Sequence, residues 1–332
     1  MLRAAILGLG WWGKTIVGRM KDSQKLRIVR AVELSTGPHA ELAAENGIAL
    51  GCSYDDVLAD PEIDAIILTT PNSLHRAQVE AAARAGKHVF CEKPLALTLE
   101  DAEAMIAACR EAGVILGVGH ERRFELAMIE LRWMVANDEL GTIMHAEAAF
   151  SHDKLVNVPA TDWRRSAVES PAAGMTAMGI HLTDAFVNLF GPAESVYAAT
   201  AHRVLDGENG DVVSVICRHK SGPLTYLNAT LATPLYLHFA VFGTRAWVEF
   251  RNETHPDTVG NSSLTVRFQD GCTATWTFDW TDTVKANLEA FAEAATGGRP
   301  YPIPDEEKLQ TIAILEAVVR SAMTGNAVKL DG

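Results

Sequence analysis

The sequence predicts a two-domain α/β protein, in which a doubly wound parallel sheet is followed by an α/β domain with a large, mostly antiparallel open sheet. Its 332 residues exceed the size of one ordinary domain. Strand-like and helix-like segments alternate up to about residue 120, as they do in parallel sheets covered by helices on both faces. Beyond residue 120, strand-like segments follow one another at short intervals, which is typical of antiparallel sheets. We therefore expect domains at residues 1–120 and 121–332.

The first domain is expected to hold short apolar strands separated by helices. Strands are predicted at Ala4–Leu7, Leu26–Val32, Ala65–Thr70, His88–Cys91 and Val114–Val118. Helices are predicted from the glycine loop after Leu7 to about Met20, and at Ala40–Asn46, Tyr54–Leu58, Leu74–Ala85 and Leu99–Ala112. Because ligands bind such sheets at the carboxyl ends of the strands, polar motifs at these ends are candidate site residues.

The second domain is expected to surround its sheet with a few helices. Helices are predicted at Phe124–Ala136, Met175–Phe190, Val284–Thr296 and Glu306–Thr324. Strands are predicted at Ile143–Phe150, Ser195–Thr200, Val212–Arg218, Leu224–Thr230, His238–Gly243, Trp247–Phe250, Leu264–Phe268 and Thr273–Phe278. The polar segment Ser151–Ser170 is predicted to be an irregular loop. Trp276, Phe278 and Trp280 alternate with a period of two, which indicates a buried sheet face or a subunit interface.

Composition excludes several classes of partner. The formal net charge of −13 disfavours nucleic acid, because an acidic chain repels phosphate backbones. The five cysteines are scattered without CxxC spacing, which argues against a disulfide framework or a structural zinc site and favours a reducing cytoplasm. No apolar run approaches the roughly 20 residues that cross a bilayer. The apolar stretch Leu2–Leu9 is too short for a secretory signal and is interrupted by Arg3.

A glycine loop follows the first predicted strand. Gly8-Leu9-Gly10-Trp11-Trp12-Gly13 matches GxGxxG between a strand and a helix, the context in which this pattern binds a dinucleotide in a Rossmann domain. Gly8 permits the tight turn, Gly10 lets the backbone approach a pyrophosphate, and Gly13 lets helix and strand pack closely. The start of the helix offers free N–H groups to the phosphates.

Glu33 indicates which dinucleotide is bound. It follows Gly13 by 20 residues, at the end of the second predicted strand. A carboxylate there hydrogen-bonds the adenosine ribose hydroxyls and repels the additional phosphate of NADP. The sequence therefore favours NAD as the cofactor, with NADP as the alternative. Under a plainer interpretation, Glu33 is a solvated charge at a strand end.

A lysine is held rigidly at the end of another predicted strand. In Cys91-Glu92-Lys93-Pro94, the proline restricts the backbone of Lys93 to extended conformations. We expect Lys93 to point toward the nicotinamide end of the cofactor, whose positive ring would lower the lysine pKa and suit it to proton transfer near neutral pH. The plainer alternative is an ordinary surface lysine.

With these motifs the chain resembles the Gfo/Idh/MocA (glucose-fructose oxidoreductase / inositol dehydrogenase) family over nearly its whole length. The matching motifs are the glycine loop, Thr70-Pro71-Asn72-Ser73-Leu74-His75, Glu92-Lys93-Pro94 and Gly179-Ile180-His181-Leu182-Thr183-Asp184. The resemblance implies a Rossmann domain, then an α/β domain whose open sheet commonly forms a dimer or tetramer interface. It implies substrates that are sugars, cyclitols or related alcohols.

The resemblance also implies roles for individual residues. Residues of the glycine loop, Trp11 and Trp12 included, would contact the cofactor, as would Thr70, Pro71, Asn72, His75 and Glu92. Lys93 would be catalytic, and His181 would exchange a proton with the reacting hydroxyl. Asp184, one helical turn on, would orient His181 or hold a substrate hydroxyl.

One position departs from the family pattern. Many members carry an aspartate four residues before this histidine, and here that residue is Ala177. The chain is therefore similar to a subgroup that includes phthalate dihydrodiol dehydrogenase-like proteins, and more of the chemistry falls to Lys93 and His181.

Other candidate residues lie where the domains are expected to meet and in the long loop. His120 and Arg123 are expected to line the substrate cleft, where the arginine would clamp a carboxylate; an interdomain salt bridge is the alternative. Trp163 and Arg164 would cover the substrate, or Trp163 would simply anchor the loop. No metal is expected, because His145, His152 and Asp153 do not form a full ligand set.

The leading hypothesis is an NAD(P)-dependent oxidoreductase that moves a hydride between the cofactor and a hydroxyl or carbonyl of a small sugar, cyclitol or related diol. A second hypothesis keeps the fold but takes a carboxylated dihydrodiol or a hemiacetal-type aldehyde. A third is a non-catalytic NAD(P)-binding sensor, against which the retention of both Lys93 and His181 argues.

Overall fold

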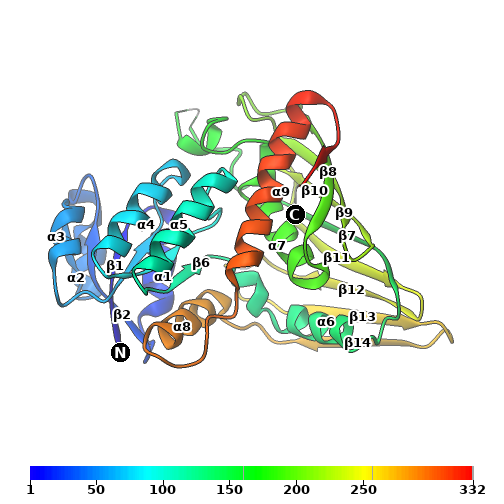
Figure 1. Cartoon of the computed structure of the whole chain (residues 1–332), viewed down its shortest axis with the longest axis horizontal. Coiled ribbons are helices and arrows are strands. Elements are labelled where there is room, and N and C mark those ends of the chain that lie inside the picture. Colours follow the sequence, from blue (N-terminus) through cyan, green and yellow to red (C-terminus); the bar gives the residue numbers. More distant parts are fainter. Residues whose placement is uncertain (160, 256, 331–332) are drawn as a thin grey trace. The chain divides into compact units, whose positions relative to one another are not determined.

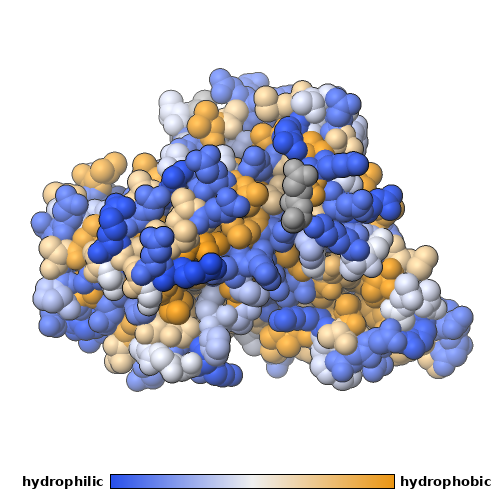
Figure 2. All heavy atoms as spheres, viewed as in Figure 1, coloured by the Kyte–Doolittle hydropathy of each residue, from blue (hydrophilic) through white to orange (hydrophobic). Residues whose placement is uncertain are grey.

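The computed structural model describes residues 1–159, 161–255 and 257–330, and these form two compact units. Unit 1 contains Met1–Glu121 and Asp282–Lys308, and unit 2 contains Arg122–Thr281 and Leu309–Gly332. Each unit has its own sheet (Figure 1). Hydrophilic residues cover much of the face seen in Figure 2, as the acidic composition leads one to expect.

Unit 1 is built on a parallel sheet of six strands in the order β3-β2-β1-β4-β5-β6. These are β1 (Leu2–Leu7), β2 (Leu26–Val32), β3 (Ala49–Gly51), β4 (Ala65–Leu68), β5 (His88–Cys91) and β6 (Leu116–Val118). Every residue of β4 is buried, which explains its continuous apolar sequence. The prediction of a doubly wound parallel sheet is confirmed. The short β3 was not foreseen, because three residues are too few to show the pattern of a strand.

Helices connect these strands. They are α1 (Trp11–Met20), α2 (Ala40–Glu45), α3 (Tyr54–Ala59), α4 (His75–Arg84) and α5 (Leu99–Glu111), with 3₁₀ turns at Gly37–His39, Asn72–Leu74 and Glu121–Phe124. Ser53 and Thr98 cap α3 and α5 by accepting backbone N–H bonds from Asp56 and Asp101. The glycines after α2, α4 and α5 have positive φ, as helix C-terminal caps require.

A late segment of the chain returns to unit 1. Helix α8 (Thr283–Ala295) buries Leu288 and Phe291 completely in the core that includes β1 and β2. The Phe291 ring lies 5.6 Å from the Phe90 ring, and a side chain at Gly117 would collide with both. The sequence predicted this helix but placed it in a continuous domain 121–332, whereas its apolar face packs in unit 1.

Unit 2 is built on a sheet of nine strands in the order β14-β13-β12-β11-β7-β10-β9-β8-β15. They are β7 (Ile143–Ser151), β8 (Ala193–Ala201), β9 (Val212–His219), β10 (Leu224–Thr230), β11 (Tyr236–Gly243), β12 (Ala246–Asn252), β13 (Ser262–Phe268), β14 (Thr273–Phe278) and β15 (Val328–Lys329). Among the described strands of this second sheet, only β7 and β10 pair in parallel, so the large, mostly antiparallel sheet is confirmed.

The helices of unit 2 are α6 (Leu126–Ala136), α7 (Gly179–Phe190) and α9 (Asp305–Thr324), which begins in unit 1. The prediction that α7 begins at Met175 is wrong. Ala173–Met175 form a separate 3₁₀ turn. At its start, Ala172 and Ala173 have positive φ angles of 56° and 54°. A second 3₁₀ turn spans Trp163–Arg165 in the predicted loop. Among the described helices, none combines the length and apolar character needed to span a membrane.

The aromatic alternation at the end of the sheet is not a buried face within this chain. Trp276 lies in β14, the first strand in the sheet order, and its side chain is 44% exposed. Phe278 and Trp280 are half-buried. The other interpretation, a subunit interface, stays a prediction.

Candidate functional site

The glycine loop turns sharply between β1 and α1. Gly8 adopts φ +92°, a conformation that side chains rarely allow, and its carbonyl accepts a 2.6 Å hydrogen bond from the Thr69 hydroxyl. A Cβ at Gly13 would collide with the Gly8 carbonyl, so this glycine permits the close approach of helix and strand. A Cβ at Gly10 would meet nothing within 4 Å, so the backbone there is open to an approaching group.

The start of α1 fits a pyrophosphate. Its N-cap residue, Gly10, provides no side-chain cap, and its first turn has no acidic residue, so backbone N–H groups are available to an anion. Trp11 is 55% exposed and Trp12 is half-buried beside it, with ring centroids 5.3 Å apart. The residues present therefore fit the dinucleotide that the sequence predicts.

Glu33 follows β2 and lies against the glycine loop. Its carboxylate accepts a hydrogen bond from the backbone N–H of Leu9, and Nε2 of His39 lies 3.9 Å from it. The acid is thus at the same sheet edge as the glycine turn, where a ribose next to the pyrophosphate would be. The next residue, Leu34, is fully exposed and leaves this edge open.

His75 joins the two other motifs of this sheet edge. Its ring is completely buried, with Nδ1 3.1 Å from the Pro94 carbonyl and Nε2 3.2 Å from the Thr70 carbonyl. These contacts hold the Thr70–His75 segment against the Glu92-Lys93-Pro94 turn, so His75 positions both motifs. Pro71 and the buried Asn72 lie in the sequence between Thr70 and His75.

Lys93 and Glu92 follow β5 at the same edge. Lys93 is half-buried and is joined to Pro94 by a cis peptide bond. Glu92 is buried, and burial raises its pKa to about 7, while the Trp12 indole and the Lys93 ammonium oppose that rise. A Cβ at Gly119 would overlap the Glu92 carboxylate, so the glycine after β6 leaves room for it. The neighbouring His120 is also buried.

In unit 2, Arg123 and Asp184 form a buried ion pair. Nε and Nη2 of Arg123 donate bonds of 2.8 and 2.6 Å to the two carboxylate oxygens, and the two side chains are only 7% and 3% exposed. Nη1 of Arg123 lies 3.4 Å from Oδ1 of Asn188, one turn further along α7. Both residues, predicted to bind substrate, bind each other within unit 2.

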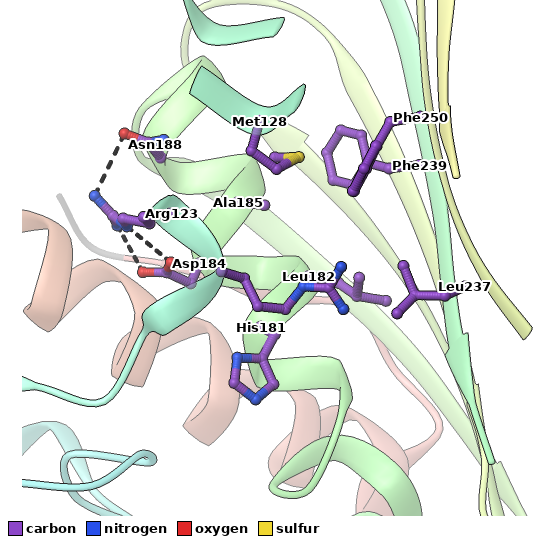
Figure 3. A pocket seen from close by; sticks show the side chains of 11 residues that line it. Arg123, Met128, His181, Leu182, Asp184, Ala185, Asn188, Leu237, Phe239 and Phe250 are labelled. Carbon is purple, nitrogen blue, oxygen red and sulfur yellow. Dashed lines mark hydrogen bonds and ion pairs between the residues drawn. The ribbon is translucent and has the colours of Figure 1, made fainter. Parts of the chain in front are cut away.

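His181 lies one turn before Asp184 on α7. Its side chain is buried, and its ring lies below the Arg123–Asp184 pair, to which it does not point (Figure 3). Arg122, His181 and Asp184 provide the polar lining of a narrow pocket with Arg123 and Asn188. The apolar lining comes from α6, α7, β11 and β12: Met128, Leu182, Ala185, Leu237, Phe239 and Phe250.

Arg122 is a pocket residue that the sequence analysis did not select. Nη2 donates to Asn252 at 2.9 Å and to Glu125 at 3.2 Å, and burial raises the pKa of Glu125. Within the part of the chain that the structure describes, Nη1 of Arg122 is buried and has no hydrogen-bond partner. The guanidinium also stacks on Phe150, 5.1 Å from the ring centroid. The sequence alone does not distinguish Arg122 from Arg123, because the difference in their partners arises only from tertiary packing.

Three imidazoles surround the same phenylalanine. The Phe150 centroid lies 5.6 Å from His152, 6.1 Å from His181 and 5.6 Å from His255. His152 directly follows β7, and His255 lies in the loop between β12 and β13. His255 was missed because it lies 74 residues beyond His181 in an irregular segment, without a recognisable motif.

The loop after β7 contains the remaining candidates. The Arg164 guanidinium stacks on Trp163 at 4.2 Å and binds Asp162 at 3.2 Å. The Arg164 carbonyl accepts a bond from Asn209, which ties the turn to the loop before β9. These contacts resemble those of a loop anchor. In the described ranges no group of three His, Cys, Asp or Glu side chains is placed to hold a metal ion.

Two family models cover most of the chain. Residues 2–120 match the Gfo/Idh/MocA model described as an oxidoreductase family with an NAD-binding Rossmann fold, and residues 128–249 match the GFO/IDH/MocA C-terminal domain. The chain belongs to the Gfo/Idh/MocA oxidoreductase family. As a member, it is an NAD(P)-dependent dehydrogenase whose N-terminal Rossmann domain binds the cofactor.

Several relatives carry names that state a sugar substrate. The chain is 33% identical over 310 residues to 1,5-anhydro-D-fructose reductase of Ensifer adhaerens, which covers 92% of this chain and 91% of the relative. It is 31% identical to D-xylose 1-dehydrogenase (NADP(+)) 2 of Haloferax volcanii over 84% of each. The crystal structure of aldose-aldose oxidoreductase from Caulobacter crescentus, complexed with glycerol, matches with a TM-score of 0.88 at 27% identity over 99% of each chain.

Proposed function

We propose that this family member transfers a hydride between NAD and a CH–OH or C=O carbon of a small sugar, cyclitol or related diol. The observation that carries the proposal is the placement of Lys93 at the carboxyl end of β5, on the sheet edge that also holds the open glycine turn and Glu33. An amine carried by the chain at the edge where the cofactor binds suits proton transfer to or from a reacting oxygen. The sugar-active relatives support the substrate class.

Two side chains would perform the proton chemistry. The nicotinamide cofactor supplies hydride acceptance or donation. By the family resemblance, His181 of α7 would accept the proton of the reacting hydroxyl, and Lys93 would stabilise the negative charge that develops on the oxygen. The buried His75 would keep the turn bearing Lys93 in place through the Pro94 carbonyl.

The Lys93→Ala variant tests this assignment. We expect kcat to fall about 10²–10⁴-fold, the usual contribution of one acid–base group, while NAD affinity measured by calorimetry stays within a few-fold. Lys21→Ala, at an exposed lysine after α1, is the matched control. The assay would follow NADH with D-xylose, inositol and 1,5-anhydro-D-fructose, the last in the reducing direction. Near-normal turnover of Lys93→Ala would remove Lys93 from the mechanism.

The cofactor preference is part of the proposal. Glu33 lies against the glycine loop through Leu9, where its charge would repel a 2′-phosphate. We therefore propose NAD over NADP, although the Haloferax relative is an NADP enzyme. Comparing KM for the two cofactors tests it, and a lower KM for NADP would reverse the choice.

A second substrate class is favoured by one observation. Arg122 lines the pocket with His181, and its buried Nη1 has no hydrogen-bond partner among the described residues. A carboxylate is the strongest acceptor for a buried guanidinium. A hydroxylated ring carboxylate, as in the dihydrodiol hypothesis, would therefore use Arg122, because Asp184 already occupies Arg123. The test compares kcat/KM for D-glucuronate with kcat/KM for D-xylose in wild type and in Arg122→Met. If this ratio is the same in both proteins, a carboxylated substrate that binds Arg122 is excluded.

We also propose that the protein self-associates through the unit 2 sheet. Tyr197, Ile216 and Tyr226 face one another across β8, β9 and β10, and they are 44%, 46% and 36% exposed. Such a row of apolar side chains is suited to burial between two copies. Light scattering should give a dimer or tetramer mass for wild type and a smaller mass for Ile216→Glu. A monomeric wild type would contradict the proposal.

A further inference from the structure

His255 belongs to a chain of charged and polar contacts in unit 2. Its Nδ1 lies 2.6 Å from Oδ1 of Asp257, and Oδ2 of Asp257 accepts a 2.7 Å bond from the ammonium of Lys154. The Thr258 hydroxyl donates to Oδ1 at 2.9 Å. The three side chains Lys154, Asp257 and His255 come from two separate loops, which these contacts join.

These contacts determine which ring nitrogen of His255 carries the proton. Lys154 and the imidazole lower the Asp257 pKa to about 2 against the opposing effect of burial, so the carboxylate is ionised and can only accept. Nδ1 of His255 therefore donates to this carboxylate at 2.6 Å, a much shorter contact than the 3.4 Å from the Asp257 backbone N–H to the same nitrogen. Burial lowers the His255 pKa to about 4, so the ring is neutral near pH 7. Nε2 then carries a lone pair.

In the part of the chain that the structure describes, only Nδ1 of His255 has hydrogen-bond partners. Among the described residues, no hydrogen bond reaches Nε2, and the side chain keeps 14% of its surface exposed. A buried structural histidine commonly satisfies both nitrogens, as His219 does with Gly191 and Thr225. His255 satisfies only one, and an aspartate fixes its orientation.

His255 also lies near the residue assigned to proton transfer. Its ring is 5.6 Å from the Phe150 ring, which is 6.1 Å from the His181 ring. His152, which begins the loop that holds Lys154, has its ring 5.4 Å from the His255 ring. An acceptor in this position is within reach of a substrate only a few carbon atoms long that contacts His181. Hydroxyl groups are the donors that such a substrate would offer.

We propose that His255 is a substrate-binding residue, whose Nε2 accepts a hydrogen bond from a hydroxyl other than the reacting one. Asp257 and Lys154 act through it as positioning residues. The site therefore selects compounds that carry a second hydroxyl near the reacting carbon. This inference rests on the proposed function, because it takes His181 as the residue at the reacting hydroxyl.

The decisive variant is His255→Phe, which keeps a flat ring against Phe150 and removes the acceptor. We expect KM for D-xylose to rise about 3–10-fold, the cost of one hydrogen bond, with kcat changed less than twofold. A deoxyxylose lacking the hydroxyl that His255 binds should show no such rise. His145→Phe is the matched control, since His145 is an exposed histidine stacked on Phe242 on the same sheet. A change below twofold with every polyol tested would overturn the inference.

A binding measurement separates this inference from the proposed function. Nitrogen NMR of histidine-labelled wild-type protein with NAD should show His255 protonated at Nδ1, and D-xylose or inositol should shift its Nε2 resonance. If no polyol is oxidised but this shift occurs, the proposed function fails and the binding role stands. If turnover occurs and the Nε2 resonance does not move, the binding role fails alone. If neither occurs, both are overturned.

Discussion

Replacing Asp184 by asparagine should destabilise unit 2 strongly, because it leaves the guanidinium of Arg123 charged and buried. The wild-type pair has two bonds of 2.6 and 2.8 Å and exposed fractions of 7% and 3% for the two side chains. Removing one partner of such a pair typically costs about 3–5 kcal/mol. Since a whole domain has a net stability of about 5–15 kcal/mol, this loss is a large part of it.

Urea unfolding followed by circular dichroism measures this loss as a shift in midpoint. Glu62→Gln is the matched control, since the Arg3–Glu62 pair is 3.9 Å long and 46% and 74% exposed, and its loss should cost less than about 1 kcal/mol. The double variant Arg123→Met/Asp184→Leu should regain stability, because it leaves no unpaired charge. If Asp184→Asn unfolds like the control, the buried-pair reasoning is refuted.

Three further predictions concern unit 1, which contains the Rossmann domain. Gly10→Ala should weaken NAD binding at an unchanged melting temperature, whereas Gly13→Ala should lower the melting temperature, because only the second Cβ collides with Gly8; equal melting temperatures for the two variants would contradict this. Glu33→Ser should lower the ratio of KM for NADP to KM for NAD, and an unchanged ratio would show that Glu33 does not determine the cofactor preference. Burial raises the Glu92 pKa from 4.5 to about 7, so the folded state retains a proton that the unfolded state loses, and stability should fall by about 3 kcal/mol as pH rises from 4.5 to 7. In Glu92→Gln, the melting temperature should fall less between pH 4.5 and 7 than it does in wild type. An equal fall in both proteins would refute the raised pKa of Glu92.

The sequence by itself determined the family and, apart from β3 and the placement of α8, the elements of unit 1. The glycine pattern spans six consecutive residues. The motifs at Thr70–His75 and Glu92–Pro94 each come just after a strand. Local chemistry of this kind is readable because turn conformation, helix start and strand end depend on neighbouring residues. Sheet order in unit 1 then brings these segments to one edge, as parallel pairing of β1, β4 and β5 requires.

Only the tertiary structure decided which polar side chains in unit 2 are already satisfied. It pairs Arg123 with Asp184, leaves Nη1 of the adjacent Arg122 without a hydrogen-bond partner among the residues described, and orients His255 through Asp257. It also packs α8 in unit 1, far along the chain from the strands that it covers. These outcomes depend on contacts between segments 61 or more residues apart, or on loops without periodicity. Burial and pairing of charges arise from such packing, so no local pattern encodes them.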